Sequence, residues 1–133
     1  MRLTALCALV LPLLAACGGD AAPEPTGPRY LNLGIERWAE LITSNDLEVQ
    51  QEEMNRLGLG RPDVIPVLTA LLDHETPDVV LNAFFCLEAN LKKVQRLKRD
   101  VSPWVPLIDM AVASAHPRVA ELAPELKTTY VGD

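Results

Sequence analysis

Along most of the chain, apolar residues recur every three or four positions and are interrupted by short polar turns. This spacing places apolar side chains on one face of a helix, so it predicts a helical protein. In the middle of the chain, Pro62 is expected in the first turn of such a helix. The apolar face of this helix contains Val64, Ile65, Leu68, Leu71 and Leu72.

A second predicted helix follows the turn DHETP. Thr76 is its expected N-cap, Pro77 its first residue, and Asp78 lies near the positive end of the helix dipole. Its predicted buried face contains Val80, Ala83, Phe84, Leu87, Leu91 and Val94.

The segment before this pair predicts another pair of helices. The apolar face of its first helix contains Leu31, Ile35, Trp38 and Ile42. Asn45 or Asp46 is expected to cap its second helix, which ends at Gly58. The apolar positions of this second helix are Val49, Met54 and Leu57.

A third pair is predicted near the end of the chain. Ser102 is the expected cap of its first helix and Pro103 opens that helix. The break AHP, residues 115–117, then precedes the last helix. Both tryptophans of the chain, Trp38 and Trp104, are expected to be core or cap residues.

The middle and last pairs repeat one another at a constant offset of forty residues. The segments IPVLTALLDHETPDVVLNA and VPLIDMAVASAHPRVAELA begin at residues 65 and 105. Their alignment pairs Pro66 with Pro106, Pro77 with Pro117, Val79 with Val119 and Ala83 with Ala123. A weaker copy covers residues 40–58.

This period, the paired prolines and the segment LLDHETPDVVLNA resemble HEAT repeats, which stack helix pairs into an α-solenoid. The resemblance covers roughly residues 30 to 130 and implies an all-α fold of about three antiparallel helix pairs; a compact six-helix bundle is the alternative. HEAT repeats usually carry an arginine directly after the valine of the second helix. Gln50, Val80 and Ala120 occupy these positions here, so we expect the arginine ladder to be absent or rebuilt and stacking to depend on apolar contacts.

Residues 1–16 have the features of a signal peptide. Arg2 supplies a positive charge, residues 3–14 are apolar, and Ala15 and Ala16 are the small residues that precede a cleavage point. The apolar run is too short to cross a hydrocarbon core about 30 Å thick, which needs around 20 residues. We therefore expect this segment to be removed and not to remain as a membrane span.

The residues Leu14, Ala15, Ala16 and Cys17 resemble the lipobox of bacterial lipoproteins. The resemblance implies that the Cys17 thiol carries a diacylglycerol, which would anchor the chain at the surface of a membrane. It also implies a place in the bacterial cell envelope, on the periplasmic or outer face. Gly18 after the cysteine favours the outer membrane if the organism has two membranes. Ordinary secretion with a coincidental cysteine is the alternative.

Residues 17–29 form the lipidated cysteine and a linker, and residues 30–133 form the folded domain. Residues 18–28 read GGDAAPEPTGP and have almost no bulky apolar side chains, so they cannot build a core. Fully extended, this linker reaches roughly 35–40 Å from the lipid surface.

The net charge of −6 argues against a nucleic-acid partner, because proteins that bind nucleic acids are usually basic. The three cysteines are too widely spaced for a zinc site, and Cys86 alone remains if Cys7 leaves with the signal peptide and Cys17 is acylated. We expect no catalytic residues, metal or cofactor. His74 and His116 could together form a metal site, but polar, solvated turns are the favoured interpretation. Cys86 could be a nucleophile, but a small buried apolar residue is the favoured interpretation.

A basic stretch, LKKVQRLKR at residues 91–99, stands out in this acidic chain. Lys92, Arg96 and Arg99 are predicted on one helical face, and Leu91, Val94 and Leu97 on the other. The simpler interpretation is a solvated helix end, where cations complement the dipole. The alternative is contact of Lys92, Lys93, Arg96 and Arg99 with anionic lipid headgroups or an acidic partner.

Together these features predict a non-enzymatic, lipid-anchored module that binds another protein through a HEAT-like surface. The alternative function is a ligand-binding or lyase-like HEAT-repeat protein that acts on a prosthetic group.

Overall fold

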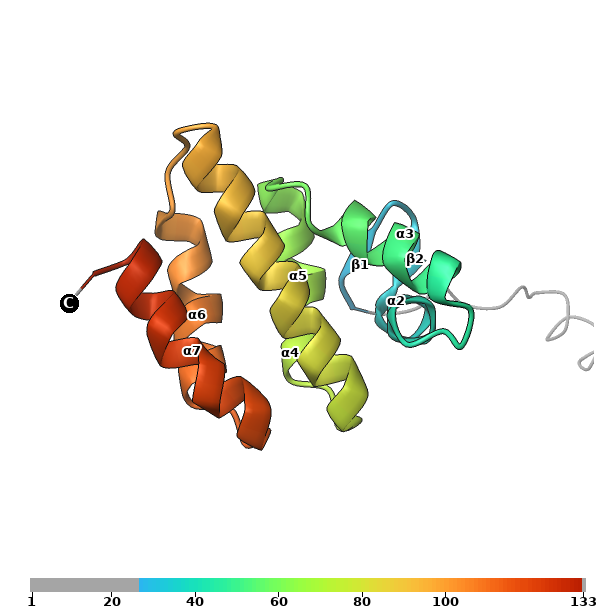
Figure 1. Cartoon of the computed structure of the whole chain (residues 1–133). Helices are drawn as coiled ribbons and strands as arrows, with labels where there is room; N and C mark the ends of the chain where they lie inside the picture. The colour runs from blue at the N-terminus through green and yellow to red at the C-terminus, as the bar shows by residue number, and fades with distance from the viewer. Residues whose placement is uncertain (1–26, 133) are drawn as a thin grey trace, which may run out of the picture.

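The computed structural model of the chain describes residues 27–132, so residues 1–16 and Cys17 lie outside the described part. Within residues 27–132 the protein is mostly helical, and six helices pack in adjacent pairs (Figure 1). The pairs are α2 (Ile35–Ile42) with α3 (Leu47–Leu57), α4 (Ile65–Leu72) with α5 (Pro77–Arg96), and α6 (Val105–Val112) with α7 (Pro117–Tyr130). The short 3₁₀ helices η1 (Pro62–Val64) and η2 (Ser102–Trp104) lead directly into α4 and α6.

The helices also contact one another between pairs. Helix α4 packs against both α2 and α6, and helix α5 packs against both α3 and α7. In Figure 1, α5 lies in front of α4 and α7 lies in front of α6. Helix α5, at 20 residues, is the longest element within residues 27–132 and contacts helices of both other pairs.

The chain enters the domain through a small hairpin and not through a helix. Strand β1 (Arg29–Tyr30) pairs antiparallel with β2 (Leu33–Gly34). The prediction that Leu31 lies on the apolar face of the first helix is wrong, because Leu31 is an exposed turn residue with φ +52°. Tyr30 is buried instead. Its ring packs 6.0 Å from the Trp38 ring, and its carbonyl accepts a hydrogen bond of 3.0 Å from the Trp38 indole N–H.

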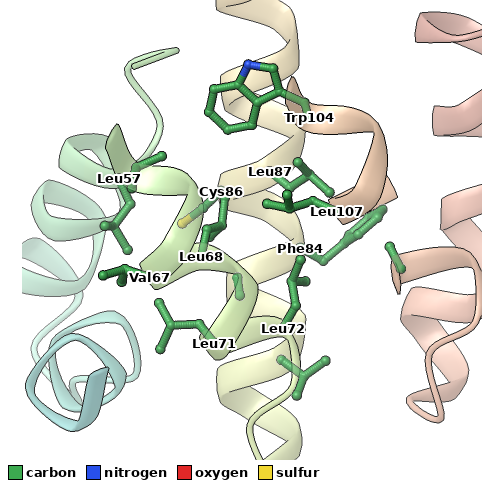
Figure 2. Close-up of a cluster of buried hydrophobic side chains, with 14 of the residues drawn as sticks. Leu57, Val67, Leu68, Leu71, Leu72, Phe84, Cys86, Leu87, Trp104 and Leu107 are labelled. Atoms are coloured by element: carbon green, nitrogen blue, oxygen red, sulfur yellow. The ribbon is translucent and has the colours of Figure 1, made fainter. Parts of the chain in front are cut away.

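The core runs through all three helix pairs and is built mainly from leucine, valine and alanine. Figure 2 shows its centre, where Phe84 and Leu87 of α5 lie near Leu107 of α6. The six α5 residues predicted to be buried are all buried, and so are Trp38 and Trp104. In α4, Val67 is fully buried, whereas the sequence pattern had favoured Ile65, which is half-buried.

Two of the predicted helix starts are confirmed. The Asp46 carboxylate caps α3, since it accepts hydrogen bonds from the backbone N–H groups of Glu48 and Val49 at 3.0 and 3.4 Å. Thr76 is the N-cap residue of α5 and Pro77 is its first residue, although the Thr76 side chain makes no capping hydrogen bond.

The predicted cap at Ser102 is wrong. Ser102 is the first residue of η2, and its N-cap residue is Val101, whose side chain makes no capping hydrogen bond. The residue before the cap, Asp100, hydrogen bonds to Ser102 instead. The Asp100 carboxylate accepts hydrogen bonds from the Ser102 backbone N–H at 3.0 Å and from the Ser102 hydroxyl at 2.8 Å. These bonds favour the charged form and lower the pKa of Asp100 from its ordinary value.

Asn90 is the fully buried polar residue of the core within residues 27–132. Its amide donates to the carbonyl of Leu57 at 2.7 Å and to the carbonyl of Cys86 at 2.8 Å. Its side-chain oxygen accepts from the backbone N–H of Gly60 at 2.7 Å. Asn90 therefore connects α5 to the end of α3 and to the loop that follows.

A second amide connection joins α5 to the end of α2. The Asn82 side chain of α5 donates to the Ile42 carbonyl at 2.8 Å, and the Gln50 side chain of α3 donates to the same carbonyl at 3.0 Å. From the missing arginines we had expected stacking to depend on apolar contacts. Between the first and second pairs, side-chain amides contribute as well. The buried amide of Asn90 and the half-buried amide of Asn82 hold these two pairs together.

Two glycines let the loop after α3 approach α5 closely. A Cβ atom at Gly58 would lie 2.8 Å from the Ala89 Cβ, and one at Gly60 would lie 2.8 Å from the Lys93 Cβ. Gly60 also has φ +76°, a conformation that favours glycine. Gly58 is the C-cap of α3, as predicted, but it is required for space and not for a positive φ.

We predict that Asn90→Ala destabilises the protein by about 2–4 kcal/mol, because it leaves the buried Gly60 N–H without an acceptor and removes two further hydrogen bonds. Asn82→Ala is the matched control and should cost about 1 kcal/mol, because it removes one hydrogen bond. Urea unfolding followed by circular dichroism measures both. Equal losses for the two variants would contradict the role given to Asn90.

Candidate functional site

The basic stretch at residues 91–99 begins in the last turns of α5 and ends in a tight reversal of the chain. Lys98 has φ +57°, and its N–H donates to the Gln95 carbonyl at 3.0 Å. The Arg99 N–H donates to the Val94 carbonyl at 2.9 Å. This is the Schellman arrangement, which satisfies the last carbonyls of a helix, here with lysine at the position usually taken by glycine.

This reversal changes the predicted faces of the stretch. The helix ends at Arg96, so Arg99 lies outside it and does not share a helical face with Lys92. Arg99 instead points back to the loop after α3, where its guanidinium lies 3.5 Å from the Gly60 carbonyl. Leu97, predicted on the apolar face, is 47% exposed. Leu91 and Val94 are buried as predicted.

The cations of this stretch differ from several other cations of the domain in having no carboxylate partner within residues 27–132. We call Lys92, Lys93, Arg96, Lys98 and Arg99 the basic segment. Lys93 is half-buried and the other four are exposed. Within residues 27–132, none of the five has a carboxylate oxygen within 4.0 Å of its charged nitrogens. By contrast, a carboxylate lies within that distance of Arg37, Arg56, Arg61, Arg118 and Lys127.

A hollow of about 310 Å³ lies on the surface between α3 and α5. Leu47, Met54 and Phe85 supply its apolar lining, and Gln50, Gln51 and Asn55 supply amides. Leu47 is 73% exposed and Phe85 is 37% exposed. Large apolar side chains exposed beside a hollow are typical of binding surfaces.

A second hollow, of about 230 Å³, lies between α5 and α7. Phe84, Leu122 and Tyr130 line it together with the carboxylates of Glu88 and Glu125 and with Lys92 of the basic segment. Because α5 borders both hollows, the second helices of the three pairs share one hollowed surface. We call it the second-helix face.

The turns at the opposite end of α5 and α7 enclose a cleft of about 590 Å³. His74 and His116 both line this cleft, as the sequence suggested, together with Leu72, Val80 and Met110. The structure describes no group of three or more His, Cys, Asp or Glu side chains in residues 27–132 that could hold a metal ion.

Both histidines have hydrogen bonds that fix the turns. The His74 Nδ1 accepts from the Thr76 N–H at 3.1 Å, and its Nε2 lies 3.2 Å from a carboxylate oxygen of Glu36. The His116 Nδ1 accepts from the Arg118 N–H at 3.1 Å and so caps α7. A histidine cap was not predicted, since serine, threonine, aspartate and asparagine are the usual N-caps.

Cys86 lies in the core beneath the first hollow. It is 1% exposed, and Figure 2 shows it between Leu57 and the body of α5. Burial raises the pKa of the Cys86 thiol to about 12, so the thiol is protonated near neutral pH. A protonated, enclosed thiol packs as a small apolar residue and is a poor nucleophile.

The remaining predicted site, Cys17, lies outside the described residues. Within residues 27–132, no helix has both the length and the apolar character needed to cross a bilayer. Searches against protein-family models, curated proteins and solved structures found no match.

Sequence reasoning missed Leu47 and Phe85 as surface residues. Leu47 directly follows the Asp46 cap, and Phe85 is next to the buried Phe84. A helical-wheel plot separates Phe84 from Phe85 by about 100°, so it could have placed Phe85 off the buried face. A helical-wheel plot could not have shown that Phe85 of α5 faces α3 across a hollow, because it describes one helix at a time.

We predict that replacing Lys92, Lys93 and Arg96 with glutamine changes the free energy of unfolding by less than about 0.5 kcal/mol, because none of these charges forms an ion pair within residues 27–132. Chemical unfolding of the triple variant measures this change. A large loss of stability would show that the segment supports the fold and is not free for binding.

Proposed function

We propose that the six helices form a short HEAT-like α-solenoid. The starts of η1, α4 and α5 precede those of η2, α6 and α7 by forty residues each. The starts of α2 and α3 precede those of α4 and α5 by thirty. First helices contact first helices and second helices contact second helices along the domain. This order of contacts supports stacked pairs over a compact bundle.

The protein is a lipid-anchored component of a bacterial cell envelope. Its leader, residues 1–16, is removed, Cys17 carries the lipid, and residues 18–28 are the tether. In an organism with two membranes, Gly18 after the acylated cysteine favours the outer one. The lipobox-like residues 14–17 and the proline-rich stretch after them support this assignment.

The folded domain binds another protein through the second-helix face. One observation carries this proposal: Leu47 and Phe85 are exposed on opposite sides of a hollow between α3 and α5. Neither side chain is needed to fill the core, whereas both offer apolar surface to a partner. The neighbouring hollow is lined by Glu88 and Glu125 as well as by Lys92, so it offers a partner charged side chains of both signs beside its apolar surface.

Anchoring is tested by Cys17→Ala in the native organism. The expected result is loss of the mature protein from the membrane fraction, or accumulation of the uncleaved form, because no thiol remains to accept the lipid. Cys7→Ala is the matched control, since Cys7 lies within the leader, and it should leave anchoring unchanged. Normal membrane retention of the Cys17 variant in cell fractionation would contradict lipidation.

Partner binding is tested by Phe85→Gln, with Val112→Gln as its control. Both side chains are 37% exposed, but Val112 lies on α6, a first helix. Crosslinking in the native cell should give an adduct with the wild-type chain and the Val112 variant, and at least a tenfold weaker adduct with the Phe85 variant. Equal adducts for all three chains would show that the second-helix face does not bind the partner.

A further inference from the structure

The basic segment belongs to a continuous edge of the domain. Asn90 and Arg99 hold the loop at residues 58–61 against the end of α5 through Gly60. Lys98, Arg99 and Tyr130 line one hollow of about 410 Å³, which joins the end of α7 to the same edge. The ends of α3 and α7 therefore flank the end of α5 on its two sides, and we call the surface around the end of α5 the basic edge.

Exposed aliphatic side chains project from the loops and helix ends of this edge. Leu97 stands between Arg96 and Lys98 in the sequence and is exposed. Leu59, in the loop after α3, and Val131, after α7, are also exposed. Isolated aliphatic side chains flanked by cations are the combination that peripheral proteins present to a lipid interface.

Several carboxylates lie near this edge. The Asp63 carboxylate lies 3.3 Å from the Arg61 guanidinium, and Asp100 accepts two hydrogen bonds from Ser102. Neither carboxylate lies within 4.0 Å of a charged nitrogen of the basic segment. Asp100 shares a hollow with Lys98 and Arg99, and Glu88 and Glu125 share another with Lys92. The five cations of the basic segment therefore lie near carboxylates but form no direct ion pair within residues 27–132.

We propose that the basic edge docks on anionic lipid headgroups of the membrane that anchors the chain. Each cation near an anionic bilayer strengthens binding about fivefold, and the leucines enter the boundary between headgroups and acyl chains. This inference rests on the proposed lipid anchor, because a tether of roughly 35–40 Å keeps the edge within reach of the bilayer. The hollow between α3 and α5, which no residue of the basic segment lines, then stays open to a protein partner.

The test uses the mature protein as the native organism produces it, purified and mixed with vesicles. One vesicle contains phosphatidylcholine alone, and the other contains about 30% phosphatidylglycerol. An environment-sensitive fluorophore on Leu97→Cys reports contact with lipid. The same fluorophore on Glu75→Cys is the control, because Glu75 is exposed in the turn before α5, about 30 Å from the edge. The buried Cys86 thiol stays unlabelled.

The Leu97 fluorophore should shift to the blue and be quenched by a lipid-borne quencher in the anionic vesicles. It should not respond in the neutral vesicles or at about 0.5 M salt, where charges more than a few ångströms apart are screened. The Glu75 fluorophore should not respond in either vesicle. Equal behaviour of the Leu97 fluorophore in both vesicles, or of the two fluorophores in the anionic vesicle, overturns the proposal.

A second variant separates charge from the effect of the label. Lys92→Gln, Lys93→Gln and Arg96→Gln in the Leu97→Cys chain should weaken docking about a hundredfold. An unchanged response overturns the proposal. The labelled Leu97→Cys chain is also mixed with anionic vesicles to which envelope proteins have been added. If its fluorescence responds only in the presence of those proteins, the proposal is overturned and the basic edge binds an acidic protein instead.

The anchor has a separate readout in the same experiment. A lipidated chain floats with both vesicles, whether or not the edge docks. A chain that floats with neither vesicle shows that the proposed anchor is wrong, and a chain that floats with both but gives no Leu97 response shows that the docking is wrong.

Discussion

The buried amide of Asn90 is the interaction on which the arrangement of this domain depends. It connects the long central helix α5 to the end of α3 through Leu57 and to the following loop through Gly60. An unpaired amide in this position would be costly, because the Asn90 side chain is fully buried. The amide therefore admits one position of the loop relative to α5, whereas leucine and valine contacts alone would tolerate several.

Both candidate surfaces follow from this constraint. The separation of α3 and α5 sets the hollow beside Phe85, and the position of Gly60 brings Leu59 next to the basic segment. The two surfaces differ in chemistry. The second-helix face combines apolar rings with carboxylates and amides, and the basic edge combines cations with aliphatic side chains. Such a division would let an anchored domain contact a membrane and a protein at the same time.

The helices could be predicted from the sequence because their causes are local. Apolar spacing gave the buried face of α5, and the Asp46 cap and Pro77 marked helix starts that the structure confirms. Local patterns failed where a distant residue decides the conformation. Leu31 was placed on a helix because its spacing fits one, whereas the bond from Trp38 to the Tyr30 carbonyl holds that segment in a hairpin.

The candidate site shows the same limit. The cations of the basic segment were visible in the sequence, but the exposure of Leu97 depends on the reversal at Lys98. The role of Asn90 depends on residues thirty or more positions away, and no periodic pattern marks them. The role of a polar residue such as Asn90, which lies among buried apolar residues of a helix, therefore could not be predicted from the sequence and was found only in the structure.

Hydrogen exchange at the Gly60 amide, followed by nuclear magnetic resonance, tests this account most directly. Gly60 lies in a loop, but its N–H is buried against Asn90, whereas the neighbouring Leu59 N–H has no hydrogen-bond partner within residues 27–132. The account predicts that Gly60 exchanges as slowly as the core of α5, through global unfolding, while Leu59 exchanges rapidly. Exchange of Gly60 at the rate of Leu59 would contradict it.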